Sequence, residues 1–203
     1  MTVLPSLPAL AQSALPVDEY RTELLYLAEH PGAALLRVHS LHDVPGAAPE
    51  FAGWPQRTGE CLQGDPAVLC LRPREWLLLG EATDAGTLFE RIADAAEAAT
   101  TVVYDQSDGL AVLRLGGPAA PWLLAKLGSL DFVDGAAGPA HCARTRMGHI
   151  AVVVYFRGRA DGEFDLVVDR SLARYLWELL TDSAPHAAEL ARNGGDRTPG
   201  GTA

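Results

Sequence analysis

The chain has 203 residues, of which 48% are hydrophobic and 21% are charged, as is typical of a globular protein. These proportions exclude a disordered chain, a coiled coil and a collagen-like repeat. Sixteen lysines and arginines stand against 26 aspartates and glutamates, which gives a formal net charge of −10. Because no basic run interrupts this excess, we expect neither nucleic acid nor a membrane surface as a partner.

No segment approaches the roughly 20 apolar residues of a membrane span, so the sequence predicts a soluble protein.

The cysteines and the first residues indicate the compartment. The three cysteines are Cys61, Cys70 and Cys142. An odd number without a Cys-x-x-Cys pair argues against a disulfide framework and a thiolate zinc site. The apolar opening contains Pro5 and Pro8 and has no lysine or arginine before Arg21, which is not the pattern of a signal peptide. We therefore expect a cytoplasmic protein.

Residues 1–21 are expected to form an extended N-terminal arm. The leucines of this segment, spaced among prolines without a helical or strand period, are Leu4, Leu7, Leu10 and Leu15. Prolines keep such a segment extended, and its exposed apolar side chains suit contact with a partner. Folding back onto its own domain is the alternative.

The first predicted elements of the domain are two apolar runs, residues 22–30 and 34–41, around a Pro-Gly turn. We interpret them as a strand pair, although residues 18–28 could also form a helix. A short helix is expected around Ala47–Phe51.

The next unit consists of strands at residues 66–71 and 75–80, followed by a helix that begins near Thr83 or Asp84. Its apolar stripe contains Leu88, Phe89, Ile92, Ala93 and Ala96. A third unit has runs at residues 101–105 and 110–116 around a Ser-Asp-Gly turn, then another helix.

The last unit pairs residues 150–156 with residues 164–168 and continues into a helix that ends before Pro185. Repeated strand-strand-helix units predict an α+β fold of antiparallel sheets with helices on one face. We expect residues 22–186 to form a single domain of two similar halves. The apolar pattern is then lost, and residues 187–203 are predicted to be a disordered tail.

A glycine pair is the one candidate for phosphate binding. Residues 115–122 read LGGPAAPW and join a predicted strand to a predicted helix, whose first amides could bind phosphate. The third glycine of a dinucleotide motif and the lysine of a P-loop are both missing. A tight strand-to-helix turn explains the pair equally well.

The candidates for metal binding and nucleophilic catalysis are also weak. His39 and His42 would point to opposite faces of a strand, and the adjacent His141 and Cys142 cannot easily bind one ion. A further polar group contains Asp105, Ser107 and Asp108. These are residues that favour turns, and they lack a nucleophile elbow. We therefore assign no catalytic residue and no metal site.

Arg144, Arg146 and His149 are weak candidates for a ligand site. Alternation along a strand would place both guanidinium groups on one face, where they could bind a carboxylate. Salt bridges to the acidic residues of the chain are the alternative in a protein of this charge.

Four segments, residues 71–81, 102–132, 141–158 and 164–180, together resemble the gamma subunit family of heterotetrameric sarcosine oxidase. They include LRPREWLLLGE and HCARTRMGHIAVVVYFRG. The resemblance implies the fold of the folate-binding domain of aminomethyltransferases. It also implies a complex that oxidatively demethylates N-methylglycine with oxygen, giving glycine, hydrogen peroxide and, with tetrahydrofolate, methylene-tetrahydrofolate.

In that family the alpha, beta and delta subunits carry FAD, FMN, NAD, zinc and the tetrahydrofolate site. The resemblance thus implies a non-catalytic subunit that carries no cofactor and packs chiefly against the large alpha subunit. The alternative is a free-standing folate-binding or one-carbon-transfer protein with a pterin pocket at Arg144, Arg146 or His149. A small regulatory domain that binds amino acids is a third possibility, by analogy of fold alone.

Overall fold

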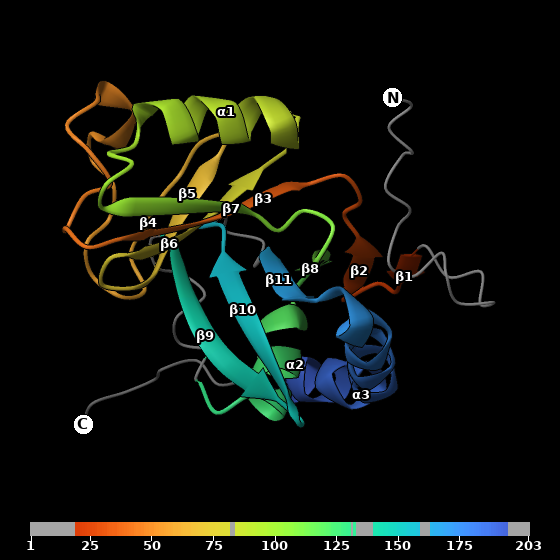
Figure 1. Cartoon of the computed structure of the whole chain (residues 1–203). Coiled ribbons are helices and arrows are strands. Elements are labelled where there is room, and N and C mark those ends of the chain that lie inside the picture. Colours follow the sequence, from red (N-terminus) through yellow and green to blue (C-terminus); the bar gives the residue numbers. More distant parts are fainter. Residues whose placement is uncertain (1–18, 82–83, 131, 133–139, 159–162, 195–203) are drawn as a thin grey trace, which may run out of the picture.

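The computed structural model describes residues 19–81, 84–130, 132, 140–158 and 163–194. Two antiparallel sheets stack face to face, and helices cover their outer faces (Figure 1). One sheet has the order β4 (Cys61–Leu62), β5 (Ala67–Arg72), β6 (Glu75–Gly80), β3 (Ala34–Ser40) and β7 (Thr101–Asp105). The other has the order β1 (Glu19–Arg21), β2 (Tyr26–Glu29), β8 (Leu110–Gly116), β11 (Phe164–Asp169), β10 (Ile150–Phe156) and β9 (His141–Met147). The predicted α+β class is confirmed.

Buried side chains form three layers, because both faces of each sheet are covered. Helix α1 (Ala85–Ala95) packs on the five-stranded sheet. Helices α2 (Ala120–Leu127) and α3 (Ala173–Gly194) pack on the six-stranded sheet. Side chains that fill the space between the sheets include Leu35, Leu69, Leu77, Leu79, Val112, Val153 and Val167. No helix in the described residues is both long and apolar enough to cross a membrane.

Two of the predicted strand pairs are local hairpins. Strands β5 and β6 pair around a turn in which Arg74 adopts a left-handed conformation, with φ of 68°. Strands β10 and β11, which are consecutive along the chain, also pair antiparallel. The predicted cap of α1 is Asp84, whose carboxylate accepts a hydrogen bond of 3.0 Å from the amide of Thr87. The short helix predicted before β4 is a 3-10 turn at Pro49–Phe51.

The other two predicted pairs are wrong, because their strands belong to different sheets. Strand β2 pairs with β1 and β8, whereas β3 pairs with β6 and β7. Strand β7 likewise lies in the five-stranded sheet and β8 in the six-stranded sheet. Alternating apolar residues indicate a strand but do not say which sheet it joins. Each short turn here passes the chain from one sheet to the other.

The strand orders of the two sheets correspond. Each strand of the five-stranded sheet has a counterpart at the same position in the six-stranded sheet. Taken in order, these pairs are β4 with β9, β5 with β10, β6 with β11, β3 with β8 and β7 with β2. The two sheets therefore share one strand order, and the single domain of two similar halves over residues 22–186 stays a prediction. The six-stranded sheet has the additional strand β1 beyond β2, and among the described residues no strand pairs with the equivalent edge of β7.

The predictions for both ends of the chain need correction. Helix α3 continues past Pro185 to Gly194, so the predicted disordered tail is wrong for residues 187–194. Buried Ala184 and Ala187 on either side of the proline pack into the core and hold this part of the helix in place. Residues 19–21 form strand β1 and are not part of an extended arm. The arm leucines, Leu4, Leu7, Leu10 and Leu15, lie outside the described residues, as do residues 195–203.

Candidate functional site

Strand β6 has a glutamate at each end of its inward face. Glu75 is its first residue, and Glu81 follows its last residue, Gly80. Between these acids, Leu77 and Leu79 point into the core between the sheets. Each glutamate meets arginines from other strands at its own end of that core. The structure therefore contains two separate ionic clusters, one at each end of β6.

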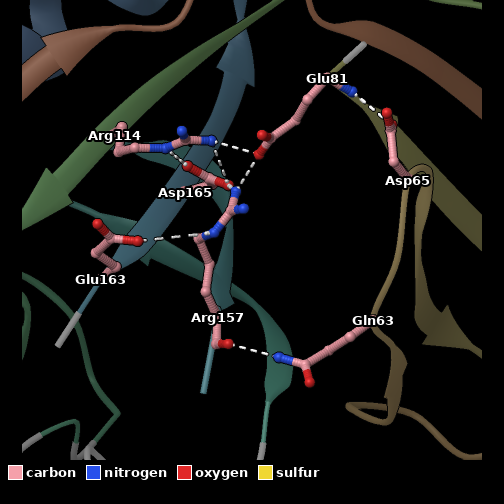
Figure 2. A network of polar contacts seen from close by, with 7 residues as sticks. All are labelled: Gln63, Asp65, Glu81, Arg114, Arg157, Glu163 and Asp165. Atoms are coloured by element: carbon pink, nitrogen blue, oxygen red, sulfur yellow. Dashed lines mark hydrogen bonds and ion pairs between the residues drawn. The ribbon is translucent and has the colours of Figure 1, made fainter. Parts of the chain in front are cut away.

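The Asp165 network, defined as Asp165, Arg114, Arg157, Glu81 and Glu163, lies at the Glu81 end (Figure 2). The Asp165 side chain is fully buried on β11. Arg114 Nε lies 2.8 Å from Asp165 Oδ1, and Arg157 Nη1 lies 2.7 Å from Asp165 Oδ2. One buried carboxylate thus holds two guanidinium groups, as charge-assisted hydrogen bonds allow.

Glu81 closes the network from the opposite sheet. Arg114 Nη2 donates a hydrogen bond of 2.7 Å to Glu81 Oε1, and Arg157 Nη1 donates to the same oxygen. Burial alone would raise the pKa of Glu81, but these arginines lower it below its usual value. The contacts with Asp165 and Glu81 likewise outweigh burial and raise the pKa of Arg157. The network therefore favours the charged forms of Glu81 and Arg157, and its ion pairs join the two sheets.

A pocket of about 220 Å³ lies beside this network. Its lining consists of Gln63, Gly64, Ala67, Leu79, Glu81, Tyr155 and Arg157. Gln63 Nε2 donates a hydrogen bond of 2.6 Å to the Arg157 carbonyl, and the Glu81 amide donates one of 2.8 Å to Asp65. Burial raises the pKa of Tyr155 to about 12, so its hydroxyl stays protonated. The charged groups of the pocket are engaged with each other, which favours a structural role.

The Glu75 cluster, defined as Glu75, Arg37, Arg72, Arg144 and His39, lies at the other end of β6. The Glu75 side chain is only 2% exposed. Its Oε1 lies 3.2 Å from Arg37 Nη1 and 3.5 Å from Arg144 Nη1, and Arg72 Nε contacts Oε2. His39 Nε2 lies 4.0 Å from Glu75 Oε1. Burial lowers the pKa of this histidine, which keeps it neutral. Three arginines share one carboxylate, so the cluster has a net charge of +2.

The unpaired charge of this cluster faces solvent. The side chains of Arg72 and Arg144 are 63% and 48% exposed, whereas Arg37 is 20% exposed. The buried Nε of Arg37 has no hydrogen-bond acceptor in the described part of the chain. Burial lowers the pKa of Arg37, and Arg144 and Arg72 lower it further, although Glu75 opposes them.

Exposed apolar side chains lie beside this cluster on the same face of the five-stranded sheet. Val102 is opposite His39 and Tyr104 is opposite Arg37 in the pairing of β7 with β3. Val102 and Tyr104 are both half exposed. The rings of Tyr104 and His39 meet edge to face at 5.9 Å between centroids. We call the Glu75 cluster together with Val102 and Tyr104 the Glu75 face.

The structure separates the three residues that the sequence suggested as ligand candidates. Arg144 belongs to the Glu75 cluster. Arg146 is exposed on the same strand, and its Nη2 donates a hydrogen bond of 2.8 Å to the carbonyl of His149. His149 is itself exposed in the turn after β9. The pocket beside Glu81 and a second pocket beside Trp54 are lined by other residues.

The other sequence candidates have structural roles. A Cβ atom on Gly117, where φ is 103°, would lie 2.6 Å from the Leu24 carbonyl oxygen, so the glycine pair makes a tight turn against residue 24. Asp105 accepts a hydrogen bond of 2.9 Å from the Ser107 amide, and Ser107 Oγ accepts one from the Leu35 amide. These contacts agree with the interpretation of both motifs as turns.

The histidines and cysteines do not assemble a metal site within the described residues, where no group of three potential ligands is found. Cys142 and Cys61 pack between the sheets, whereas Cys70 packs under α1 on the other face of the five-stranded sheet. Cys142 hydrogen-bonds with Cys61, and its Sγ lies 3.5 Å from the Cys70 carbonyl oxygen. Burial raises the pKa of Cys70 to about 11, which disfavours the reactive thiolate.

Comparison with solved structures defines the class of fold. A chain of heterotetrameric sarcosine oxidase from Corynebacterium sp. U-96 superposes with a TM-score of 0.75 at 24% identity, covering 90% of this chain and 96% of that one. Aminomethyltransferase T of the glycine cleavage system from Bartonella henselae superposes with a TM-score of 0.55 at 16% identity, covering 77% of this chain and 45% of that one. The molecule therefore has the fold shared by aminomethyltransferases and this sarcosine oxidase chain.

Sequence comparison then gives the family. The model of the sarcosine oxidase gamma subunit family matches residues 57–186, and the chain belongs to this family. An aminomethyltransferase from Streptomyces avermitilis is 28% identical over 162 residues. That match covers 77% of this chain but only 43% of the aminomethyltransferase, so the chain spans less than half of this relative.

Proposed function

We propose that this protein is the non-catalytic gamma subunit of a cytoplasmic sarcosine oxidase complex. The complex would convert N-methylglycine to glycine with hydrogen peroxide and methylene-tetrahydrofolate. In this proposal FAD, FMN, NAD and tetrahydrofolate bind to the alpha, beta and delta subunits, and this chain packs chiefly against alpha. The observation that carries the proposal is the family match over residues 57–186.

The geometry of the pocket supports a role without chemistry of its own. Arg114 and Arg157 are held by buried Asp165 and by Glu81, and the Tyr155 hydroxyl stays protonated. A general base or nucleophile needs a group that is free to exchange a proton near neutral pH. The groups of this pocket instead bind each other across the two sheets.

Purification of the tagged full-length chain from its source organism tests the proposal. We expect the alpha, beta and delta subunits in constant ratio, and peroxide production from sarcosine by the complex but not by this chain alone. Isolation of the chain without these subunits, or flavin absorption and sarcosine-dependent peroxide production by the chain alone, would contradict it.

A free-standing folate-binding or one-carbon-transfer protein is the second candidate, favoured by the likeness to an aminomethyltransferase. It requires a pterin pocket, and Arg144, Arg146 and His149 do not converge on one. Titration of the isolated chain with tetrahydrofolate is expected to give no saturable binding. Tight binding that Arg144→Ala abolishes would favour this second function.

A further inference from the structure

The Glu75 face combines an unbalanced positive charge with exposed apolar surface. Its net charge of +2 stands out in a protein with an overall charge of −10. Guanidinium groups this close to each other repel, and the single buried carboxylate offsets only part of that repulsion. A second carboxylate at Arg72 and Arg144 would relieve it, and both side chains are exposed enough to be reached.

The neighbouring strand determines what kind of molecule could supply that carboxylate. Val102 and Tyr104 offer apolar side chains beside the arginines, and among the described residues β7 has a strand partner on one side only. At the equivalent edge of the other sheet, β1 extends the sheet beyond β2. An extended peptide can pair with a free strand edge and place alternate side chains on one face of the sheet.

We propose that the Glu75 face binds an extended acidic segment of the large subunit of the complex. A carboxylate of this segment pairs with Arg72 and Arg144, and its apolar side chains cover Val102 and Tyr104. This inference rests on the proposed function and specifies the surface that carries it out. A nucleic acid fits less well, because the rest of the protein would repel its phosphates. A small free anion would leave the apolar half of the face exposed.

Charge reversal in the full complex tests the arginines. The full-length chain is co-expressed with the alpha, beta and delta subunits of its organism, and its affinity for the other subunits is measured. Arg72→Glu with Arg144→Glu is expected to weaken binding at least about 30-fold, as the loss of close interfacial charge pairs does. The matched control is Arg146→Glu, which changes another exposed arginine on the same face of β9 but outside the cluster. This variant is expected to bind within about threefold of wild type.

A photo-crosslinking side chain in place of Tyr104 gives a second measurement that leaves every arginine intact. The expected product joins this chain to a peptide of the large subunit that contains aspartate or glutamate. Crosslinks to a second copy of this chain, or to peptides without a carboxylate, would overturn the inference.

The outcomes distinguish this inference from the function on which it rests. If the chain with both Arg72→Glu and Arg144→Glu assembles as well as the wild-type chain, the inference is wrong and the proposed function survives. An equal loss with Arg146→Glu would also overturn it, because general repulsion would then explain the result. If the wild-type chain does not assemble at all, the proposed function and the inference both fail.

Discussion

The two ends of β6 use the same chemistry, an arginine–carboxylate contact, in opposite ways. In the Asp165 network three carboxylates surround two arginines that are about one-fifth exposed. In the Glu75 cluster three arginines share one carboxylate, and the side chains of Arg72 and Arg144 are about half exposed or more. The Asp165 network has more carboxylates than arginines and is more deeply buried, so it holds the two sheets together. The Glu75 cluster has more arginines than carboxylates and is partly exposed, so it can accept a partner.

This difference predicts that substitutions at the Asp165 end change stability, whereas substitutions at the Glu75 end change binding. A buried guanidinium that loses its carboxylate has no water to replace it, so the folded state becomes less stable. An exposed guanidinium that loses its carboxylate is hydrated instead, so the stability of the folded state changes little.

Asp165→Asn is expected to have the largest effect, a loss of about 3–5 kcal/mol in the free energy of unfolding, because it removes the fully buried carboxylate that Arg114 and Arg157 share and leaves them only partly exposed carboxylates as partners. Urea denaturation of the full-length chain measures it. The control is Glu163→Gln, whose partially exposed carboxylate lies 3.9 Å from Arg157 and should contribute less than about 1 kcal/mol. Similar losses for both variants would refute the central position of Asp165.

Glu75→Gln should cost less, about 1–3 kcal/mol, since two of the three arginines that it leaves remain hydrated. Sulfate should raise the melting temperature of this variant more than that of the wild-type chain, because three arginines then lack a carboxylate. If Glu75→Gln lowered the free energy of unfolding as much as Asp165→Asn does, the Glu75 cluster would be as inaccessible to water as the Asp165 network.

The two ends should also differ in their response to acid. Burial, reinforced by Arg114, lowers the pKa of His30 below its ordinary value of 6.5, and its Nε2 is buried without a hydrogen-bond partner in the described residues. Below about pH 6.5 the unfolded chain therefore takes up a proton that the folded chain does not. As the pH is lowered, the free energy of unfolding then decreases by up to about 1.4 kcal/mol per pH unit. His30→Gln should flatten this fall below about pH 6.5.

His39→Gln provides the comparison at the other end. Its pKa is also lowered by burial, but the side chain is 37% exposed, so the variant should flatten the acid response less than His30→Gln. Urea denaturation of both variants at a series of pH values measures this difference. A stronger effect at His39 would reverse the order of burial that separates the two clusters.

Arg144→Ala is expected to have the smallest effect on folding, within about 1 kcal/mol of wild type, because exposed ion pairs contribute little. Thermal unfolding of the isolated chain checks this value. A larger loss would show that Arg144 holds β9 to the five-stranded sheet and is not free to bind a partner.

The sequence predicted local elements well and long-range pairing poorly. The pairs β5–β6 and β10–β11 were found because strands that are consecutive along the chain are also neighbours in one sheet. The pairs β2 with β3 and β7 with β8 were wrong because a short turn can pass between sheets. The end of α3 was also misplaced, because a proline predicts a helix end unless tertiary contacts outweigh the lost hydrogen bond.

The candidate site was only partly predictable. Arg144 was identified, but its partners come from β3, β5 and β6, and no local pattern joins these strands. A signal was available in single acids within apolar strands, Glu75 before a run of apolar residues and Asp165 between Phe164 and Leu166. Such an acid at an inward position needs a buried cation. The identity of that cation depends on the stacking of the two sheets.

Hydrogen exchange of the full-length chain, alone and in the assembled complex, tests the central claim that the Glu75 end of β6 faces the partner. We predict that assembly slows exchange in β7 and β9, which lie at the Glu75 face, and leaves β8 and β11 around Asp165 unchanged. Protection at β8 and β11 with none at β7 would contradict this account, because the partner would then cover the closed network instead of the open one.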